Sequence, residues 1–164
     1  MFQLRIYSLE RSVKFVYSDS IFNPKHFKNF TMTLVNGTLN MDMTLLRPIQ
    51  RGFKAHVDYQ LKLKNAKNFQ SILSHLIDIC SVVDNIKDGL FKNWFKSMLK
   101  HGNFKLNCPV DVGTYYLRNW RMGTSHKFLY PGEYSGKINF FYGKYKTKTE
   151  EHVLSVTLAS VISG

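Results

Sequence analysis

The sequence has little cysteine, little proline and few acidic residues. Its 164 residues include two cysteines, four prolines and 11 acidic side chains against 23 lysines and arginines, which gives a formal net charge of +12 at pH 7. Two cysteines are too few for a small scaffold held by several disulfides, and the length predicts a single domain, residues 1–164, with its own core. The positive charge indicates nucleic acid, an anionic membrane surface or an acidic protein as a partner, or only a soluble surface.

Long apolar runs are also missing. No stretch approaches the roughly 18 to 20 consecutive apolar residues that a membrane-spanning helix needs. The N-terminal stretch MFQLRIYSLERSVKF is too polar for the core of a signal peptide. The residues themselves therefore do not reveal secretion. A secreted protein would require that a signal had been removed and that Met1 were not the natural start.

Motifs of the common enzyme classes are absent from the sequence. It contains no G-x-S-x-G element and no glycine-rich phosphate loop. No two of its histidines have the spacing that places two metal ligands on one helix face, since they stand at His26, His56, His75, His101, His126 and His152. We therefore expect a protein that is not an enzyme and that has no metal site and no cofactor.

Alternating apolar and polar residues predict antiparallel β-structure. In Ala55–Lys64 every odd position is apolar and every even position is polar, as in a strand with one wet face. The dipeptide Asn36-Gly37 stands between two alternating runs and predicts a hairpin, because both turn positions require positive φ. Further strands are predicted at Thr114–Trp120, Tyr134–Tyr142 and His152–Ile162.

One segment departs from this alternation. Apolar residues recur at helical spacing from Ile86 to Leu99 and predict one amphipathic helix near residues 85–100. Gln70–Val83 is apolar enough for a strand and is also compatible with a helix. The whole pattern predicts an all-β protein, a β-sandwich of two antiparallel sheets with a helix laid on or across it.

The two cysteines leave several interpretations open. Cys108 stands just before the predicted strand Thr114–Trp120, and Cys80 ends an apolar run on the other side of the predicted helix. Cys108 is compatible with a catalytic thiol, a metal ligand, one of two free thiols, or half of a disulfide that ties both ends of the helical segment to the sheet. Potential N-glycosylation triplets begin at Asn29 and Asn36 and favour secretion slightly.

The order of motifs between Cys80 and Tyr142 resembles that of a known family. Cys108-Pro109 is followed by GTYYL from Gly113, by Asn119-Trp120 and by LYPGEY from Leu129. This succession is similar to that of an insect family of secreted proteins related to the chemosensory B proteins. That family is in turn similar to the ML superfamily, named for myeloid differentiation factor 2-related lipid recognition. The resemblance covers residues 30–162.

The resemblance implies an immunoglobulin-like β-sandwich whose two sheets part to form an apolar, lipid-holding cavity. It also implies a secreted protein with a Cys80–Cys108 disulfide and, for some relatives, a role in insect chemosensation. The sequence departs from the family pattern in two respects, because no signal segment is visible and residues 1–30 contain no cysteine.

We therefore expect a secreted, non-enzymatic protein that binds a lipid or hydrocarbon-like ligand. A membrane surface or a receptor would be a further partner, and no specific nucleic acid is expected. Strand parity and the predicted helix give the candidate cavity residues Val57, Tyr59, Leu61, Trp94, Phe95, Met98, Tyr115, Leu117, Ile138, Phe140, Val156 and Leu158. The alternatives are an extracellular protein-interaction module with a filled core and a basic nucleic-acid-binding protein.

Overall fold

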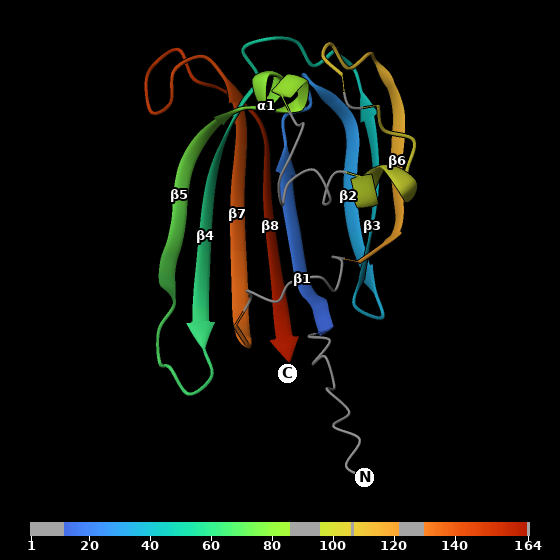
Figure 1. Ribbon diagram of the computed structural model, residues 1–164. Helices are drawn as coiled ribbons and strands as arrows, with labels where there is room; N and C mark the ends of the chain where they lie inside the picture. Colours follow the sequence, from blue (N-terminus) through green and yellow to red (C-terminus); the bar gives the residue numbers. More distant parts are fainter. Residues whose placement is uncertain (1–11, 86–95, 106, 122–129, 164) are drawn as a thin grey trace.

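The computed structural model describes residues 12–85, 96–105, 107–121 and 130–163, which form a β-sandwich of two antiparallel sheets. The larger sheet has the strand order β1-β8-β7-β4-β5 and the smaller sheet the order β2-β3-β6 (Figure 1). The predicted fold class is confirmed. At one edge of the larger sheet β1 lies next to β2 of the smaller sheet, and β5 forms the opposite edge.

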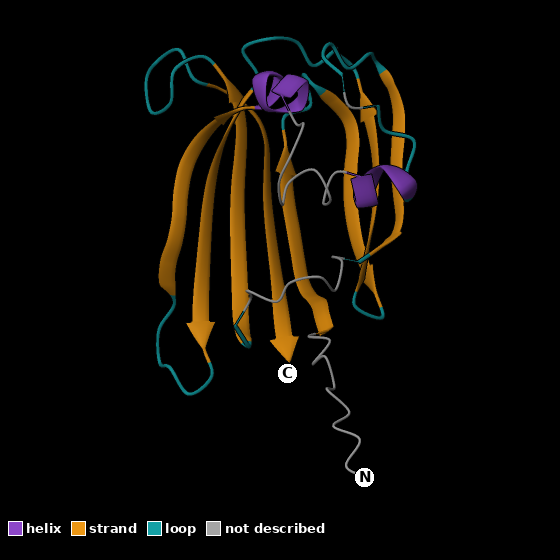
Figure 2. Cartoon of the chain, viewed as in Figure 1, coloured by secondary structure: helices purple, strands orange, loops and turns teal. Residues whose placement is uncertain are grey.

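The strands account for most of the described chain, and helix is confined to short segments (Figure 2). In chain order the elements are β1 (Ser12–Phe22), β2 (Phe27–Val35), β3 (Thr38–Leu45), β4 (Lys54–Leu63), β5 (Gln70–Asp78), α1 (Ile79–Asn85), β6 (Gly113–Trp120), β7 (Gly132–Tyr142) and β8 (Glu151–Ser163). Residues 96–100 are also helical. None of the described helices has the length and apolarity that a bilayer span requires.

The hairpin predicted at Asn36-Gly37 is the β2–β3 turn. Both residues have positive φ, 52° at Asn36 and 77° at Gly37. The turn is closed by pairing of Val35 with Thr38, and the Thr38 hydroxyl donates a hydrogen bond of 2.6 Å to the Val35 carbonyl. Asparagine and glycine tolerate this left-handed backbone better than other residues, so the local sequence favours this register of β2 against β3.

Side chains from both sheets build two core clusters. The first core cluster consists of Val13, Phe15, Leu39, Leu117, Trp120, Tyr134 and Ile162. The second core cluster consists of Phe27, Phe30, Met43, Leu45, Phe53, Val153, Leu154 and Val156. Met32, Met41, Phe104 and Leu158 are partly buried and pack against both clusters. The apolar faces that alternation predicted for β3, β6 and β8 therefore do point between the sheets.

The ambiguous segment Gln70–Val83 contains both of its predicted structures. It forms β5 as far as Asp78, and α1 then begins at Ile79. The Asp78 carboxylate accepts a hydrogen bond of 3.1 Å from the Ser81 backbone N–H, as an N-cap residue does. Of the helix predicted near residues 85–100, residues 86–95 lie outside the described residues, and residues 96–100 are helical.

Irregular pairing explains what the alternation did not predict. Strand β1 was not predicted, because a register shift between Phe15 and Tyr17 interrupts its apolar period. A second shift lies between Phe140 and Phe141 on β7. Val153 is consequently only 2% exposed in the second core cluster, although strict parity places it on the outer face. Phe141 belongs to neither core cluster, and its fully buried ring packs against Tyr145.

Candidate functional site

The inner face of β4 carries three of the predicted cavity residues. Val57, Tyr59 and Leu61 are each partly buried, and Tyr59 and Leu61 pack against the first core cluster. A filled protein interior leaves few gaps and buries inward side chains almost completely. The remaining exposure of these three residues therefore indicates that the smaller sheet does not fully cover the inner face of the larger sheet at β4.

The neighbouring strands of the larger sheet continue this face. Ile138 on β7 is the cross-strand partner of Val57, and Val156 on β8 is the partner of Ile138. Ile138 is partly buried and Val156 is only 7% exposed. Phe140 and Leu158 are partly buried and pack against the second core cluster, so these predicted residues lie on one continuous surface between the sheets.

The opposite wall contains the two candidates from β6. Leu117 is 2% exposed and belongs to the first core cluster, whereas Tyr115 is partly buried and packs against the second. Arg118, which follows Leu117 in the strand, points outward and forms an ion pair with Asp42. The predicted parity of β6 is therefore confirmed, and Leu117 is a core residue of the fold.

The candidates from the predicted helix are described only in part. Met98 is partly buried and packs against the first core cluster. Its neighbour Ser97 accepts a hydrogen bond of 3.3 Å from the indole N–H of Trp120. This contact holds the helical residues 96–100 against the end of β6. Trp94 and Phe95 lie outside the described residues.

Two tyrosine rings lie together on the inner face of the larger sheet. The rings of Tyr59 and Tyr134 are stacked with centroids 5.6 Å apart. Gly136 is the cross-strand partner of Tyr59, and a Cβ atom at Gly136 would stand 3.4 Å from the Tyr59 ring. The glycine thus allows the ring to lie close over β7. Burial, and secondarily the neighbouring Tyr134, raise the pKa of Tyr59 to about 12, so its phenol is neutral at physiological pH.

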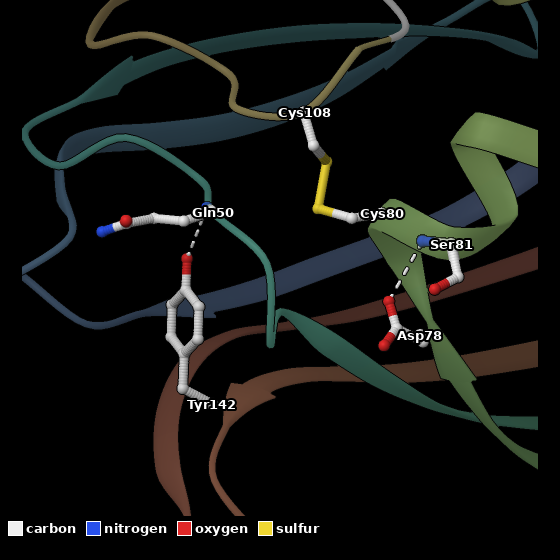
Figure 3. The surroundings of a disulfide bond; sticks show 6 residues. All are labelled: Gln50, Asp78, Cys80, Ser81, Cys108 and Tyr142. Carbon is white, nitrogen blue, oxygen red and sulfur yellow. Dashed lines mark hydrogen bonds between the residues drawn. A yellow bond between two sulfur atoms is a disulfide. The ribbon is translucent and has the colours of Figure 1, made fainter.

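The cysteines form a Cys80–Cys108 disulfide at one end of the sandwich (Figure 3). Cys80 is fully buried at the start of α1. Close to the bond, the Gln50 backbone N–H donates a hydrogen bond of 3.1 Å to the Tyr142 hydroxyl. Neither sulfur is a free thiol, so the catalytic-thiol, metal-ligand and free-thiol interpretations of Cys108 were wrong.

A chain of hydrogen-bonded side chains on the outer face of the larger sheet was not predicted from the sequence. His152 Nε2 lies 2.7 Å from the Ser155 hydroxyl, which donates a hydrogen bond of 2.7 Å to the Asn139 side-chain oxygen. Because the hydroxyl hydrogen goes to Asn139, His152 must donate the other bond, and it does not act as a base toward Ser155. Within the described ranges no three histidine, cysteine or acidic side chains gather where they would hold a metal ion.

A comparison with family models finds a match that includes the candidate residues on β4 and β6. The model described as "Protein of unknown function (DUF1091)" matches residues 55–136, half of the chain. The chain belongs to this family. No curated protein matches it. The match agrees with the family-level part of the predicted resemblance, whereas the link to chemosensory B proteins stays a prediction.

The DUF1091 segment, residues 55–136, runs from β4 into the middle of β7. It contains Val57, Tyr59 and Leu61, both cysteines and the whole of β6. Strands β1, β2, β3 and β8 lie outside it and complete both sheets. The match therefore covers part of each inner wall, whereas the candidate residues Ile138, Phe140, Val156 and Leu158 lie outside it.

The two potential glycosylation residues lie on the smaller sheet. Asn36 is exposed at the β2–β3 turn, and Asn29 is partly buried within β2. The Asn36 carbonyl also accepts a hydrogen bond of 3.3 Å from Arg121. The side chain of Asn36 is thus the more accessible of the two to a modifying enzyme.

Proposed function

We propose that this DUF1091 protein is a non-enzymatic binding protein that holds a lipid or other apolar ligand between its two sheets. The observation that carries the proposal is the incomplete burial of large inward-facing apolar side chains on β4, β7 and β8. Val57, Leu61 and Leu158 represent them, and each is only partly buried. An apolar chain laid against such side chains gains about 0.8 kcal/mol for each CH₂ group that it removes from water.

The side chains around this surface are suited to ligands of variable shape. Met32 and Met41 contact both core clusters, and Met98 contacts the first. Methionine has a flexible, polarisable side chain that adapts to irregular apolar surfaces. These residues support a site that accepts several chain shapes, as in carriers of lipids or hydrocarbons.

Export to an oxidising compartment is part of the proposal. The Cys80–Cys108 bond supports it, because disulfides persist mainly in secreted and extracytoplasmic proteins. A secreted apolar-ligand carrier also fits the predicted resemblance to insect chemosensory B proteins and to the ML superfamily. On this proposal the basic surface, with a net charge of +12, attracts anionic headgroups or an acidic receptor to the ligand.

Native mass spectrometry of the protein produced by insect cells, followed by organic extraction, tests the proposal. We expect a co-purifying lipid or hydrocarbon, or uptake of an apolar fluorescent probe by the stripped protein. Leu61→Glu, which places a charge on the inner face of β4, is expected to abolish uptake. A protein that carries nothing and takes up neither fatty acid nor probe would contradict the proposal.

Leu76→Glu provides the matched control. Leu76 lies on β5 and is 57% exposed, so the same change there leaves the inner face untouched. We expect this variant to take up the probe as the wild type does. Equal loss of uptake in both variants would indicate an effect of charge or folding, and the binding surface would then not lie on β4.

A further inference from the structure

Two hydroxyl groups beside Tyr134 on the inner face have no hydrogen-bond partner among the described residues. The first belongs to Ser160 on β8, which is 7% exposed. The second belongs to Tyr59 on β4, which is partly buried. Buried hydroxyl groups in folded proteins are almost always hydrogen-bonded to protein, water or ligand. Both groups are therefore available to a molecule that enters between the sheets.

Two other buried polar groups, in contrast, do have protein partners. His26, the other buried polar residue among those described, lies 3.0 Å from a Glu151 carboxylate oxygen. The Tyr134 hydroxyl donates a hydrogen bond of 2.7 Å to the Tyr130 carbonyl. Tyr134 and Tyr59 are stacked neighbours of the same residue type, yet only Tyr134 finds a protein acceptor.

The strand register places the two hydroxyl-bearing residues on either side of Tyr134. Ser160 is the cross-strand partner of Tyr134, and Tyr59 packs on Tyr134 from the other neighbouring strand. Ser160 has the same parity as Leu158 and Ile162, which contact the first core cluster, so its side chain points between the sheets. Around them the surface is apolar, with Phe15 and Leu61 close by.

We propose that Tyr59 and Ser160 form a polar anchor that selects apolar ligands bearing one oxygen acceptor, such as a fatty acid, an ester or a ketone, over pure hydrocarbons. This inference rests on the proposed function and assigns the orientation of the ligand within that site. The neutral phenol of Tyr59 donates to the ligand oxygen, and the Ser160 hydroxyl supplies a second donor. A hydrocarbon leaves both hydroxyl groups without a partner, whereas the oxygenated ligand satisfies them and buries its chain along the apolar face.

Competition binding tests this anchor with three probes of one chain length. Hexadecanoic acid, methyl hexadecanoate and hexadecane are each titrated into stripped wild-type protein that holds a fluorescent apolar reporter, and displacement of the reporter is measured. We expect the two oxygenated probes to bind more tightly than the alkane. Tyr59→Phe, which removes only the hydroxyl, is expected to weaken their binding about 2- to 12-fold, the range of one net hydrogen bond, and to leave hexadecane unchanged. Ser160→Ala is expected to shift the oxygenated probes in the same direction.

The controls separate this inference from the proposed function. Tyr17→Phe makes the same chemical change on the outer face, where Tyr17 is 52% exposed, and is expected to alter no affinity. Melting temperatures of all variants verify that each is folded. Equal affinity of wild type, Tyr59→Phe and Ser160→Ala for the oxygenated probes would overturn the anchor while the binding function stands. Failure of wild type to bind any of the three probes would overturn both.

Discussion

Cys80 and Cys108 are joined by a disulfide whose Cα atoms lie 5.6 Å apart across 28 positions of the sequence. Cys80 lies in α1, two positions after the end of β5, an edge strand of the larger sheet, and Cys108 precedes β6, an edge strand of the smaller one. The bond therefore ties the two sheets together at one end of the sandwich. The bond also closes a loop between residues 80 and 108, and Met98 in this loop packs against the first core cluster.

Removal of this bond is expected to destabilise the fold. In the chain-entropy model a loop of this size contributes roughly 3 to 4 kcal/mol to the free energy of unfolding. Cys80→Ala/Cys108→Ala is expected to lose about that amount in denaturant unfolding. Alanine is preferred to serine because Cys80 is fully buried and an unpaired hydroxyl there would add its own cost.

Reductant provides the control for the disulfide prediction. Wild-type stability is expected to fall to that of the double variant when the bond is reduced, and the double variant is expected to be insensitive to reductant. Equal stability of wild type and double variant under oxidising conditions would show that the bond contributes nothing to folding.

The β2–β3 turn is expected to depend on Gly37. A Cβ atom there would lie 3.2 Å from the Lys14 side chain, in a backbone conformation with φ of 77° that alanine rarely adopts. Gly37→Ala is expected to cost about 1 kcal/mol or more of unfolding free energy. Asn36→Gly, at a position whose φ is also positive, is expected to be nearly neutral. Thermal unfolding of both variants checks this, and a harmless Gly37→Ala would contradict it.

An exposed ion cluster is expected to make stability fall in acid. The Glu151 carboxylate lies 2.9 Å from Lys25 and 3.0 Å from His26, and hydrogen bonds from Lys25 first and His26 second lower its pKa below the ordinary value of 4.5. Its contribution is therefore fully present above pH 4.5 and is lost as the pH falls through the lowered pKa of the folded state.

Glu151→Gln tests this pH dependence, because the amide keeps the shape but carries no charge. Between about pH 6 and pH 3 the melting temperature of the wild type is expected to fall more steeply than that of the variant, and the two curves are expected to converge in acid. Parallel curves over this range would show that Glu151 does not couple protonation to folding.

Local patterns in the sequence predicted individual strands well. The alternation in Ala55–Lys64 corresponds to β4 within one residue at each end, and the Asn36-Gly37 signal gave the β2–β3 turn. These predictions depend on a few neighbouring residues and on one requirement for positive φ. They were correct because each strand has one inner and one outer face.

Features that depend on distant residues could not be predicted in the same way. The pairing of β1 with β8 joins the two ends of the described chain, and its register shift at Phe15 conceals the apolar period. The position of the Tyr59 ring over Gly136 requires that β4 and β7 be neighbours, although 77 positions separate these two residues. The unsatisfied hydroxyls likewise become visible only when every other polar partner has been placed.

Two leucines on the inner surfaces are expected to separate stability from binding. Leu117 is 2% exposed in the first core cluster, so Leu117→Ala leaves a cavity and is expected to cost about 2 to 5 kcal/mol of unfolding free energy. Leu61 packs against the same cluster but remains partly exposed. Leu61→Ala is therefore expected to cost less than about 2 kcal/mol, because water or a ligand already reaches the site.

For ligand binding, the expected order of the two variants is the reverse of their order in stability. If the ligand covers the exposed part of Leu61, then Leu61→Ala removes contact area from the complex and weakens uptake of an apolar probe more than Leu117→Ala does, when both are compared at temperatures where they are folded. Denaturant unfolding gives the first quantity and probe titration the second. A closed, fully packed interior would make both leucines matter only for stability, and neither variant would then change a probe affinity.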